Sequence, residues 1–320
     1  MAKYDFAKSS SGHTSANLLL KSVVTQLEEN DLHLKASTTR TAAKTTLLCI
    51  VTLSLSACGT TYTVPDISPG SEQVAKAMFA EEAGKGVSDG YAVNPRVAAQ
   101  RYNRVISRVE PVAEQFCRTQ MAEKRPDYNC DVTIVVDTDM PERNAYQTTA
   151  PDGTPIIAFT VPMLMDARND DEIAFVMGHE YGHHIATHIE KAEQQAVAGA
   201  IIMGSLMAVG QAYASSNNPY RYTGNDAQDL ENAMAAGYMM GDRAFSQTYE
   251  LESDVIATHL ARAAGYDPVK GARFFARPEA ARTETGKLSF WGTHPPDEKR
   301  LALVIQTNSE IDAKRGLQKR

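Results

Sequence analysis

Apolar residues recur at helical spacing in the first half of the folded chain. Residues from about Ser71 to Glu82 have this pattern. Between Pro95 and Lys124 the period is that of a helix face packed against a core, with apolar positions at Val105, Val109, Val112 and Phe116. We predict two helices here, the second kinked or restarted at Pro111.

Two short runs have the composition of β-strands. Asp131–Val136 is rich in β-branched residues, and Pro155–Thr160 is an apolar run that follows the turn Asp152-Gly153. Both segments predict strands of a small sheet.

A further helix is predicted after Asn169, which is a good N-cap ahead of three acidic residues. Its buried stripe is predicted at Ile173, Val176, Met177, Ile185 and Ile189. Gly182 inside this helix costs about 1 kcal/mol relative to alanine, which indicates that something packs closely against it.

Three further segments are predicted downstream. We expect a mobile loop over Ser215–Asp229 and a helix over Asp242–Ala264, with Gly265 as its C-cap and Asp267-Pro268 starting the next helix. A last helix is expected near Glu298–Thr307.

Residues Ala196–Ala214 form an uncharged stretch with many small residues. Small residues suit helix packing in lipid, so membrane association is one reading. Three glycines, Ser205, Gln211 and modest hydrophobicity favour instead a helix packed against protein.

The chain begins with a leader. Thr45–Leu55 is a short apolar run preceded by basic residues, and it ends in the sequence Leu-Ser-Ala-Cys, in which the cysteine is Cys58. This pattern is typical of a secretory signal peptide, because a bilayer span needs about 20 apolar residues. The last four residues resemble a bacterial lipobox, which predicts lipidation of Cys58; the alternative is an ordinary signal peptide with an incidental cysteine.

Length and net charge limit the domain organisation and the partners that the rest of the protein can have. We expect residues 1–57 to be removed, residues 58–70 to form a flexible tether, and residues 71–320 to form a single domain. The net charge of the 320-residue chain is −7 and no basic patch occurs, which argues against nucleic acid as a partner.

Cysteine and histidine are distributed unevenly. Outside the leader, Cys117 and Cys130 are thirteen residues apart, and export would favour a disulfide over two buried free thiols. Four of the eight histidines lie between His179 and His188. A metal site concentrates histidine in this way, whereas a structural core rarely does.

The segment His179-Glu180-Tyr181-Gly182-His183 is an H-E-x-x-H motif on the predicted helix. One helical turn separates the two histidines, so both imidazoles can bind one metal ion. Glu180 is placed to take a proton from a metal-bound water.

A catalytic zinc needs a third protein ligand and an open position for water. Glu250 and Asp254 are four residues apart and share one face of a predicted helix. Glu250 can reach the metal while Asp254 supports a ligand histidine from behind. We expect Glu252 to face solvent, and His184 and His188 to be structural or to support the ligands.

These motifs resemble the HtpX- and BepA-type zinc endopeptidases of metallopeptidase family 48. The likeness extends over about Tyr91–Ile305 and includes elements beyond H-E-x-x-H and E-x-x-x-D, namely Asn144-Ala145, Val161–Ala167, Asp171-Glu172-Ile173, Phe245-Ser246, Thr293-His294-Pro295 and Arg300. The chain departs from the family at Ser253, where alanine is usual, and in its lipobox, where many relatives carry transmembrane helices. The likeness is therefore to the soluble periplasmic branch.

The resemblance implies an α+β, mostly helical gluzincin-type fold with a small sheet beside the H-E-x-x-H helix. It implies one Zn²⁺ per chain bound by His179, His183 and Glu250, with Glu180 as general base. His294 would occupy the fourth zinc position and silence the enzyme until it moves, or would steady the oxyanion with or in place of Tyr249. The alternative for His294 is a helix start with no catalytic duty.

We expect an endopeptidase of the bacterial periplasm, anchored by lipid at Cys58. Gly59 after the cysteine favours the outer membrane. Peptide substrates would pair with Pro155–Thr160 as an edge strand, which gives loose specificity and suits cleavage of misfolded or stalled envelope and outer-membrane proteins. Outer-membrane assembly machinery is a possible partner.

Two other classes of function stay open. One is a lipoprotein chaperone or assembly factor that uses the zinc fold as a binding module. The other is a membrane-embedded prenyl-type protease, which rests on Ala196–Ala214.

Overall fold

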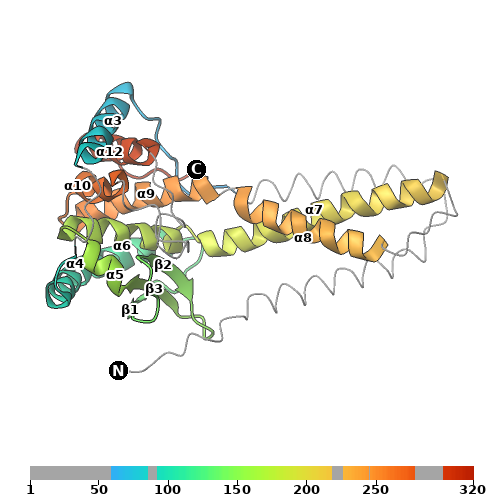
Figure 1. The fold of residues 1–320 in the computed structure, drawn as a ribbon, viewed down its shortest axis with the longest axis horizontal. Helices are drawn as coiled ribbons and strands as arrows, with labels where there is room; N and C mark the ends of the chain where they lie inside the picture. The colour runs from blue at the N-terminus through green and yellow to red at the C-terminus, as the bar shows by residue number, and fades with distance from the viewer. Residues whose placement is uncertain (1–58, 86–91, 218–225, 245, 278–297) are drawn as a thin grey trace. The chain divides into compact units, whose positions relative to one another are not determined.

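The computed structural model describes residues 59–85, 92–217, 226–244, 246–277 and 298–320 (Figure 1). Contacts divide the chain into two compact units. One is formed by Thr60–Ile189 and Ser246–Arg320, and we call it the body; the other contains Glu190–Phe245. The body carries the H-E-x-x-H motif and is described first.

A three-stranded sheet forms one layer of the body. The strands are β1 (Thr133–Asp137), β2 (Ala145–Thr149) and β3 (Pro155–Thr160), in the order β1-β3-β2. β3 is parallel to β1 and antiparallel to β2, and Phe159 lies opposite Val136 of β1 and Ala145 of β2.

The expectation that Pro155–Thr160 is an edge strand was wrong. β3 is central, and all six of its residues are buried. A continuous apolar run is typical of a strand covered on both faces, whereas edge strands are more polar. The edge is β2, whose sequence AYQTT mixes polar and apolar residues and was not predicted as a strand.

Helix α6 (Asp170–Ile185) lies between the sheet and α9 (Ser246–Ala263), and it packs against both (Figure 1). Helix α4 (Pro95–Met121) also packs on α6 and continues through Pro111, whose side chain is exposed. Helix α5 (Val161–Asp166) joins β3 to α6. The large side chains that are fully buried in the body are Tyr62, Phe159, Phe175, Tyr181, Phe275, Ile157, Ile173, Met177, Ile185, Ile256 and Leu260.

The remaining helices of the body pack around α9, α12 (Glu298–Asp312) and α6. α3 (Pro69–Gly84) packs against α12, which in turn packs against α9. α10 (Pro268–Ala272) and the short 3₁₀ helix η3 (Arg273–Ala276) follow α9, and α10 packs on α6.

Several predicted helix boundaries are confirmed. The Asn169 side chain caps α6 by accepting from the backbone N–H of Glu172 at 3.0 Å. Gly265 adopts φ +82° after α9, and Asp267 caps α10. The end of α6 differs from the prediction: the helix stops at Ile185, Thr187 turns the chain with φ +56°, and Ile189 is exposed.

The start of the described chain also differs from the flexible tether that we expected. Tyr62 is 1% exposed and forms an isolated antiparallel bridge with Lys319. This part of residues 58–70 therefore packs against the body.

The second unit contains most of α7 (His188–Asn217) and α8 (Asp226–Ala244). The two helices approach closely, because a Cβ built on Gly237 would lie 2.2 Å from the Gly199 carbonyl oxygen. The helix predicted over Ala196–Ala214 lies inside α7, whereas α8 was not predicted, and residues 242–244 end α8 instead of starting α9. Within the described ranges, no helix has the length and apolar character needed to cross a membrane.

Candidate metal centre

Two histidines of α6 converge on one point. His179 and His183 are one helical turn apart, and their Nε2 atoms lie 3.0 Å apart. His179 is fully buried, and the His183 side chain is 14% exposed. His183 is therefore the more exposed of the two histidines.

Glu250 of α9 supplies the third ligand atom. Its Oε2 lies 3.3 Å from His179 Nε2, and its Oε1 lies 3.3 Å from His183 Nε2. Two ligands bound at about 2.0 Å to a tetrahedral zinc lie about 3.3 Å apart, so these separations match the edges of such a site. The described residues that could hold a metal ion together are His179, His183 and Glu250.

Asp254 lies behind the first ligand, one helical turn after Glu250. Its Oδ1 is 2.9 Å from His179 Nδ1, which leaves Nε2 of the ring facing the site. Arg300 of α12 donates to both carboxylate oxygens of Asp254, at 2.7 and 2.8 Å, and lies 3.1 Å from Glu250. Arg300 therefore fixes both carboxylates.

The charges around the site favour a cation at the ligand atoms. Burial lowers the pKa of His179, but the carboxylates of Glu250 and Asp254 outweigh burial and raise it to about 9. Burial also raises the pKa of Asp254, yet the charge and hydrogen bonds of Arg300 more than offset this and leave the pKa lowered. The carboxylates thus favour positive charge at His179, whereas burial lowers the pKa of His183 and favours the neutral ring that a metal ion binds.

Glu180 follows His179 on α6 and is 1% exposed. A buried carboxylate directly beside the ligands is available for proton transfer at the site. Its role as general base remains a prediction.

The expectation that Glu252 faces solvent was wrong. Glu252 is fully buried, its Oε2 lies 2.9 Å from His188 Nε2, and its Oε1 accepts from the Tyr62 backbone N–H at 2.6 Å. The error has a physical cause: α9 is covered by α6 on one side and α12 on another, so more than one of its faces is buried. The Tyr249 ring, considered for the oxyanion, stacks on His188 with ring centroids 4.3 Å apart.

Glycines allow α6 and α9 to approach closely enough to share a metal. A Cβ on Gly182 would lie 2.9 Å from Ser253 Cα, and one on Gly178 would lie 3.2 Å from Ala257 Cα. The close packing inferred from Gly182 is confirmed.

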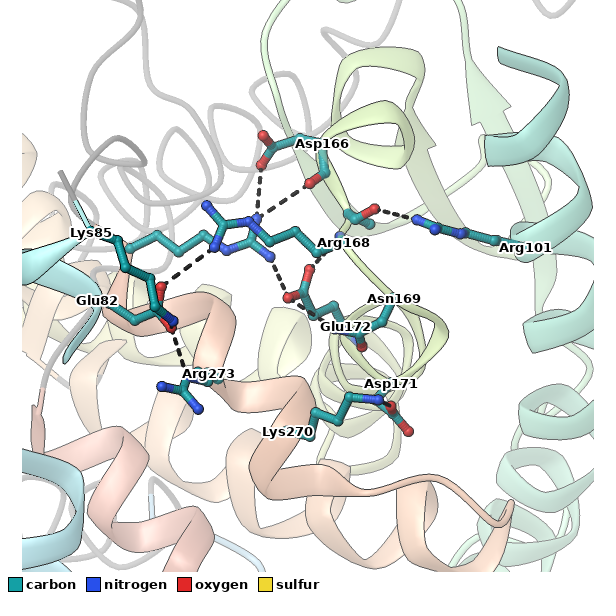
Figure 2. Close-up of polar contacts among 12 residues, drawn as sticks. Glu82, Lys85, Arg101, Asp166, Arg168, Asn169, Asp171, Glu172, Lys270 and Arg273 are labelled. Atoms are coloured by element: carbon teal, nitrogen blue, oxygen red, sulfur yellow. Dashed lines mark hydrogen bonds and ion pairs between the residues drawn. The ribbon is translucent and has the colours of Figure 1, made fainter. Parts of the chain in front are cut away.

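Polar contacts hold the first turn of α6 in place (Figure 2). Glu172 accepts from the backbone N–H of Arg168 at 2.7 Å and pairs with Arg277, while Lys270 of α10 pairs with Asp171 at 2.6 Å. Both carboxylates lie near the helix N-terminus, where negative charge is favourable. These contacts therefore anchor the N-terminal end of α6, whereas the metal ligands lie towards its C-terminal end.

The other predicted residues fall into two groups. Cys117 and Cys130 form a disulfide that joins α4 to the segment before β1. His294 and Cys58 lie outside the described residues, so the structure does not place them. Sequence reasoning missed the contact of Arg300 with Asp254 and the pairing of His188 with Glu252. The signals were the place of Arg300 in the family resemblance and the position of His188 soon after the motif.

The amino-acid sequence of this chain is similar to those of known proteins. The model of peptidase family M48 matches residues 99–307. The mitochondrial metalloendopeptidase OMA1 of Arabidopsis thaliana is 30% identical over 159 residues, which is 48% of this chain and 27% of that protein. The metalloprotease LoiP of Escherichia coli (strain K12) is 29% identical over 142 residues, 44% of this chain and 51% of that protein.

A second OMA1, that of Schizosaccharomyces pombe (strain 972 / ATCC 24843), is 29% identical over 154 residues, 48% of this chain and 41% of that protein. The matches thus span about half or less of the length of these relatives. No solved structure matches the chain significantly.

Proposed function

This chain belongs to peptidase family M48, and we propose that it is a zinc-dependent endopeptidase that cleaves unfolded or misfolded proteins. The observation that carries the proposal is the convergence of His179, His183 and Glu250 at the separations of a tetrahedral zinc site. Among the described residues three side chains converge, and a site with three protein ligands would keep a position for a reacting water, as catalytic rather than structural zinc sites do.

When bound, zinc supplies Lewis acidity that lowers the pKa of water towards about 7 and polarises a peptide carbonyl. Glu180 would take a proton from the attacking water as the C–O bond forms, and would give it to the leaving amine as the C–N bond breaks. Asp254 keeps His179 oriented, and Arg300 holds Asp254 and Glu250 in place. Burial of these groups strengthens each electrostatic contact.

Substrate would bind as an extended strand along β2. β2 is an edge of the sheet as the structure describes it, and α6 packs against β2 and β3. Pairing through main-chain hydrogen bonds reads little of the substrate sequence, which is consistent with loose specificity. This replaces Pro155–Thr160 as the pairing strand.

A role in quality control of the bacterial envelope follows from the leader. The lipobox-like sequence ending at Cys58 supports a lipid anchor in the periplasm, and Gly59 favours the outer membrane. Tethering at that membrane would bring the site to misfolded or stalled outer-membrane proteins and to their assembly machinery.

The test uses the Glu180→Gln variant, with the exposed Glu298→Gln as matched control. We expect the parent and both variants to bind one zinc per chain, and the parent and Glu298→Gln to cleave casein. Glu180→Gln should lose cleavage by a factor of about 100 or more, because proton transfer contributes about 10²–10⁴-fold.

Two outcomes would contradict the proposal. Cleavage by Glu180→Gln at the parent rate would exclude Glu180 as the base. Zinc binding without cleavage by any variant, together with suppression of casein aggregation, would favour the chaperone or assembly factor.

A further inference from the structure

The second zinc ligand has a supporting pair of its own. His183 Nδ1, the nitrogen that faces away from Glu250, lies 3.0 Å from His188 Nδ1. His188 Nε2 in turn lies 2.9 Å from Glu252 Oε2. His188 is 3% exposed and Glu252 is fully buried, and both distances are those of direct hydrogen bonds.

A metal ion bound to His183 would determine where the protons lie in the contacts from His183 through His188 to Glu252. A neutral histidine that binds zinc through Nε2 carries its proton on Nδ1 and donates it. His183 Nδ1–H therefore donates to His188 Nδ1, which places the proton of His188 on Nε2, facing Glu252. The Ser253 hydroxyl is also 3.3 Å from His188 Nδ1, but this nitrogen has a single lone pair, and His183 is the nearer donor at 3.0 Å. Every donor in the chain then faces an acceptor.

The backbone between α6 and α7 adopts an unusual conformation next to the contact between His183 and His188. Thr187 lies between α6 and α7 with φ +56°, a conformation that β-branched residues rarely adopt. The turn brings His188 back against His183 one turn after the motif. Local strain of this kind persists only where surrounding contacts hold it, and it is concentrated at functional sites.

The far end of the chain is fixed as well. Glu252 Oε1 accepts from the Tyr62 N–H at 2.6 Å, and Tyr62 is held by its bridge to Lys319. Both oxygens of Glu252 are therefore acceptors in fixed directions.

We propose that His188 and Glu252 are positioning residues for the zinc site, holding His183 in the orientation and tautomer that bind zinc. They do for His183 what Asp254 does for His179. This inference rests on the zinc site of the proposed function, but not on peptidase activity.

Glu252→Gln separates this role from packing, because glutamine has nearly the same shape. Its amide offers one acceptor and one N–H₂ donor in place of two acceptors. If the oxygen faces Tyr62 N–H, the amide donor faces His188 Nε2–H; if the amide turns, it faces Tyr62 N–H. In either orientation the amide donor faces another N–H donor. If His188 changes tautomer to avoid this, its proton moves to Nδ1, where it faces the His183 Nδ1–H donor instead.

The experiment measures the zinc dissociation constant of the full chain by competition with a chelator, together with the visible spectrum of the cobalt-substituted protein. We expect Glu252→Gln to weaken zinc binding by about 10–100-fold, the usual effect of losing a group that orients a ligand. His188→Asn keeps an acceptor near His183 Nδ1 but does not reach Glu252, so it should weaken binding less than His188→Ala. All three changes should alter the cobalt spectrum.

His184→Gln is the matched control. His184 is the next residue on α6, 5% exposed, and it contacts Tyr128 and the Asn129 carbonyl oxygen, at 3.2 and 2.8 Å, instead of the ligands. Its loss should lower the melting temperature and leave zinc affinity within about threefold of the parent.

Three results decide the matter. Weakened binding in the His188 and Glu252 variants but not in the control supports the proposal. Parent-like affinity in Glu252→Gln and His188→Ala overturns it, as does equal weakening in the control. A parent that binds no zinc would contradict the proposed function instead.

Discussion

At the scale of the residue, Asp254 connects the metal site to the last helix. It accepts from Arg300 through both oxygens, and both side chains are buried. Asp254→Ala leaves Arg300 buried with Glu250 as its remaining carboxylate partner among the contacts described. Removal of one member of a buried pair costs about 3–5 kcal/mol, so we expect a loss of this order in the free energy of unfolding, measured with urea on the metal-free protein.

The control is Asp312→Ala. Asp312 pairs with Arg262, but both side chains are largely exposed, and such pairs contribute about 0–1 kcal/mol. Equal losses in the two variants would contradict the view that Asp254 and Arg300 form a buried support for the site.

Residue identity predicted the ligand set better than it predicted the supporting residues. Spacing alone placed His179 and His183 on one helix face and Glu250 and Asp254 on another, because a helical turn fixes which residues share a face. Glu252 was predicted to face solvent, but whether a helix face is exposed depends on how many other helices pack against it. The local sequence of α9 does not contain this information. The roles of Arg300 and His188 likewise depend on elements distant in the sequence.

At the scale of the element, the separation of α6 and α9 sets the geometry of the metal site. Gly182→Ala would place a methyl group 2.9 Å from Ser253 Cα and 3.0 Å from its carbonyl oxygen, both of them backbone atoms. We expect a loss of about 1–3 kcal/mol in the free energy of unfolding, together with weaker zinc binding, because His183 moves away from Glu250.

Gly84→Ala provides the comparison. A Cβ on Gly84 meets nothing within 4 Å, so this substitution near the end of α3 should change neither stability nor zinc affinity appreciably. Parent-like zinc binding by Gly182→Ala would show that the helices do not need this close approach.

The sheet has its own acid-sensitive contact at the end of β1. Burial raises the pKa of Asp137, but hydrogen bonds from the Tyr146 hydroxyl and from the backbone N–H groups of Asp139 and Met140 outweigh it and lower the pKa. A lowered pKa adds stability that is present above the ordinary aspartate pKa of about 3.9 and is lost as the pH falls further.

Asp137→Asn should therefore be less stable than the parent at pH 7 and should lose less stability between about pH 5 and pH 3. Melting temperatures across this range on the metal-free protein test the prediction, with the exposed Asp127→Asn as control. Parallel pH curves for the parent and Asp137→Asn would contradict it.

Helices with clear N-caps were predictable, as Asn169 before α6 and Asp267 before α10 show. β2 and α8 were not predicted, for different reasons. β2 is a short edge strand with polar side chains, whereas α8 begins inside the segment that was predicted as a loop and contains glycines, which lower helix propensity. The order of the strands could not be read from the sequence, so the central strand β3 was predicted as an edge.

At the scale of the whole molecule, the leader predicts where the protein acts. Cys58→Ala should abolish lipid attachment, and the protein should move from the membrane fraction to the soluble periplasmic fraction. Cys117→Ala is the control cysteine, since it removes a disulfide and not an anchor. A Cys58→Ala protein that stays in the membrane fraction would contradict anchoring at this residue.

The body joins distant parts of the chain around one site. α6 contributes the histidines, α9 the carboxylates, α12 the arginine, and the segment around Tyr62 the amide that holds Glu252. This assembly is consistent with a family model that spans residues 99–307 rather than the motif alone.

The most direct test of the account measures zinc and casein cleavage on the same preparation of the full chain. The parent should carry one zinc per chain, lose cleavage when a chelator removes the metal and regain it when zinc is restored, while Glu250→Ala should bind zinc weakly and cleave little. Cleavage that persists in the zinc-free parent, or a parent that binds no zinc, would contradict the assignment of His179, His183 and Glu250 as a catalytic zinc site.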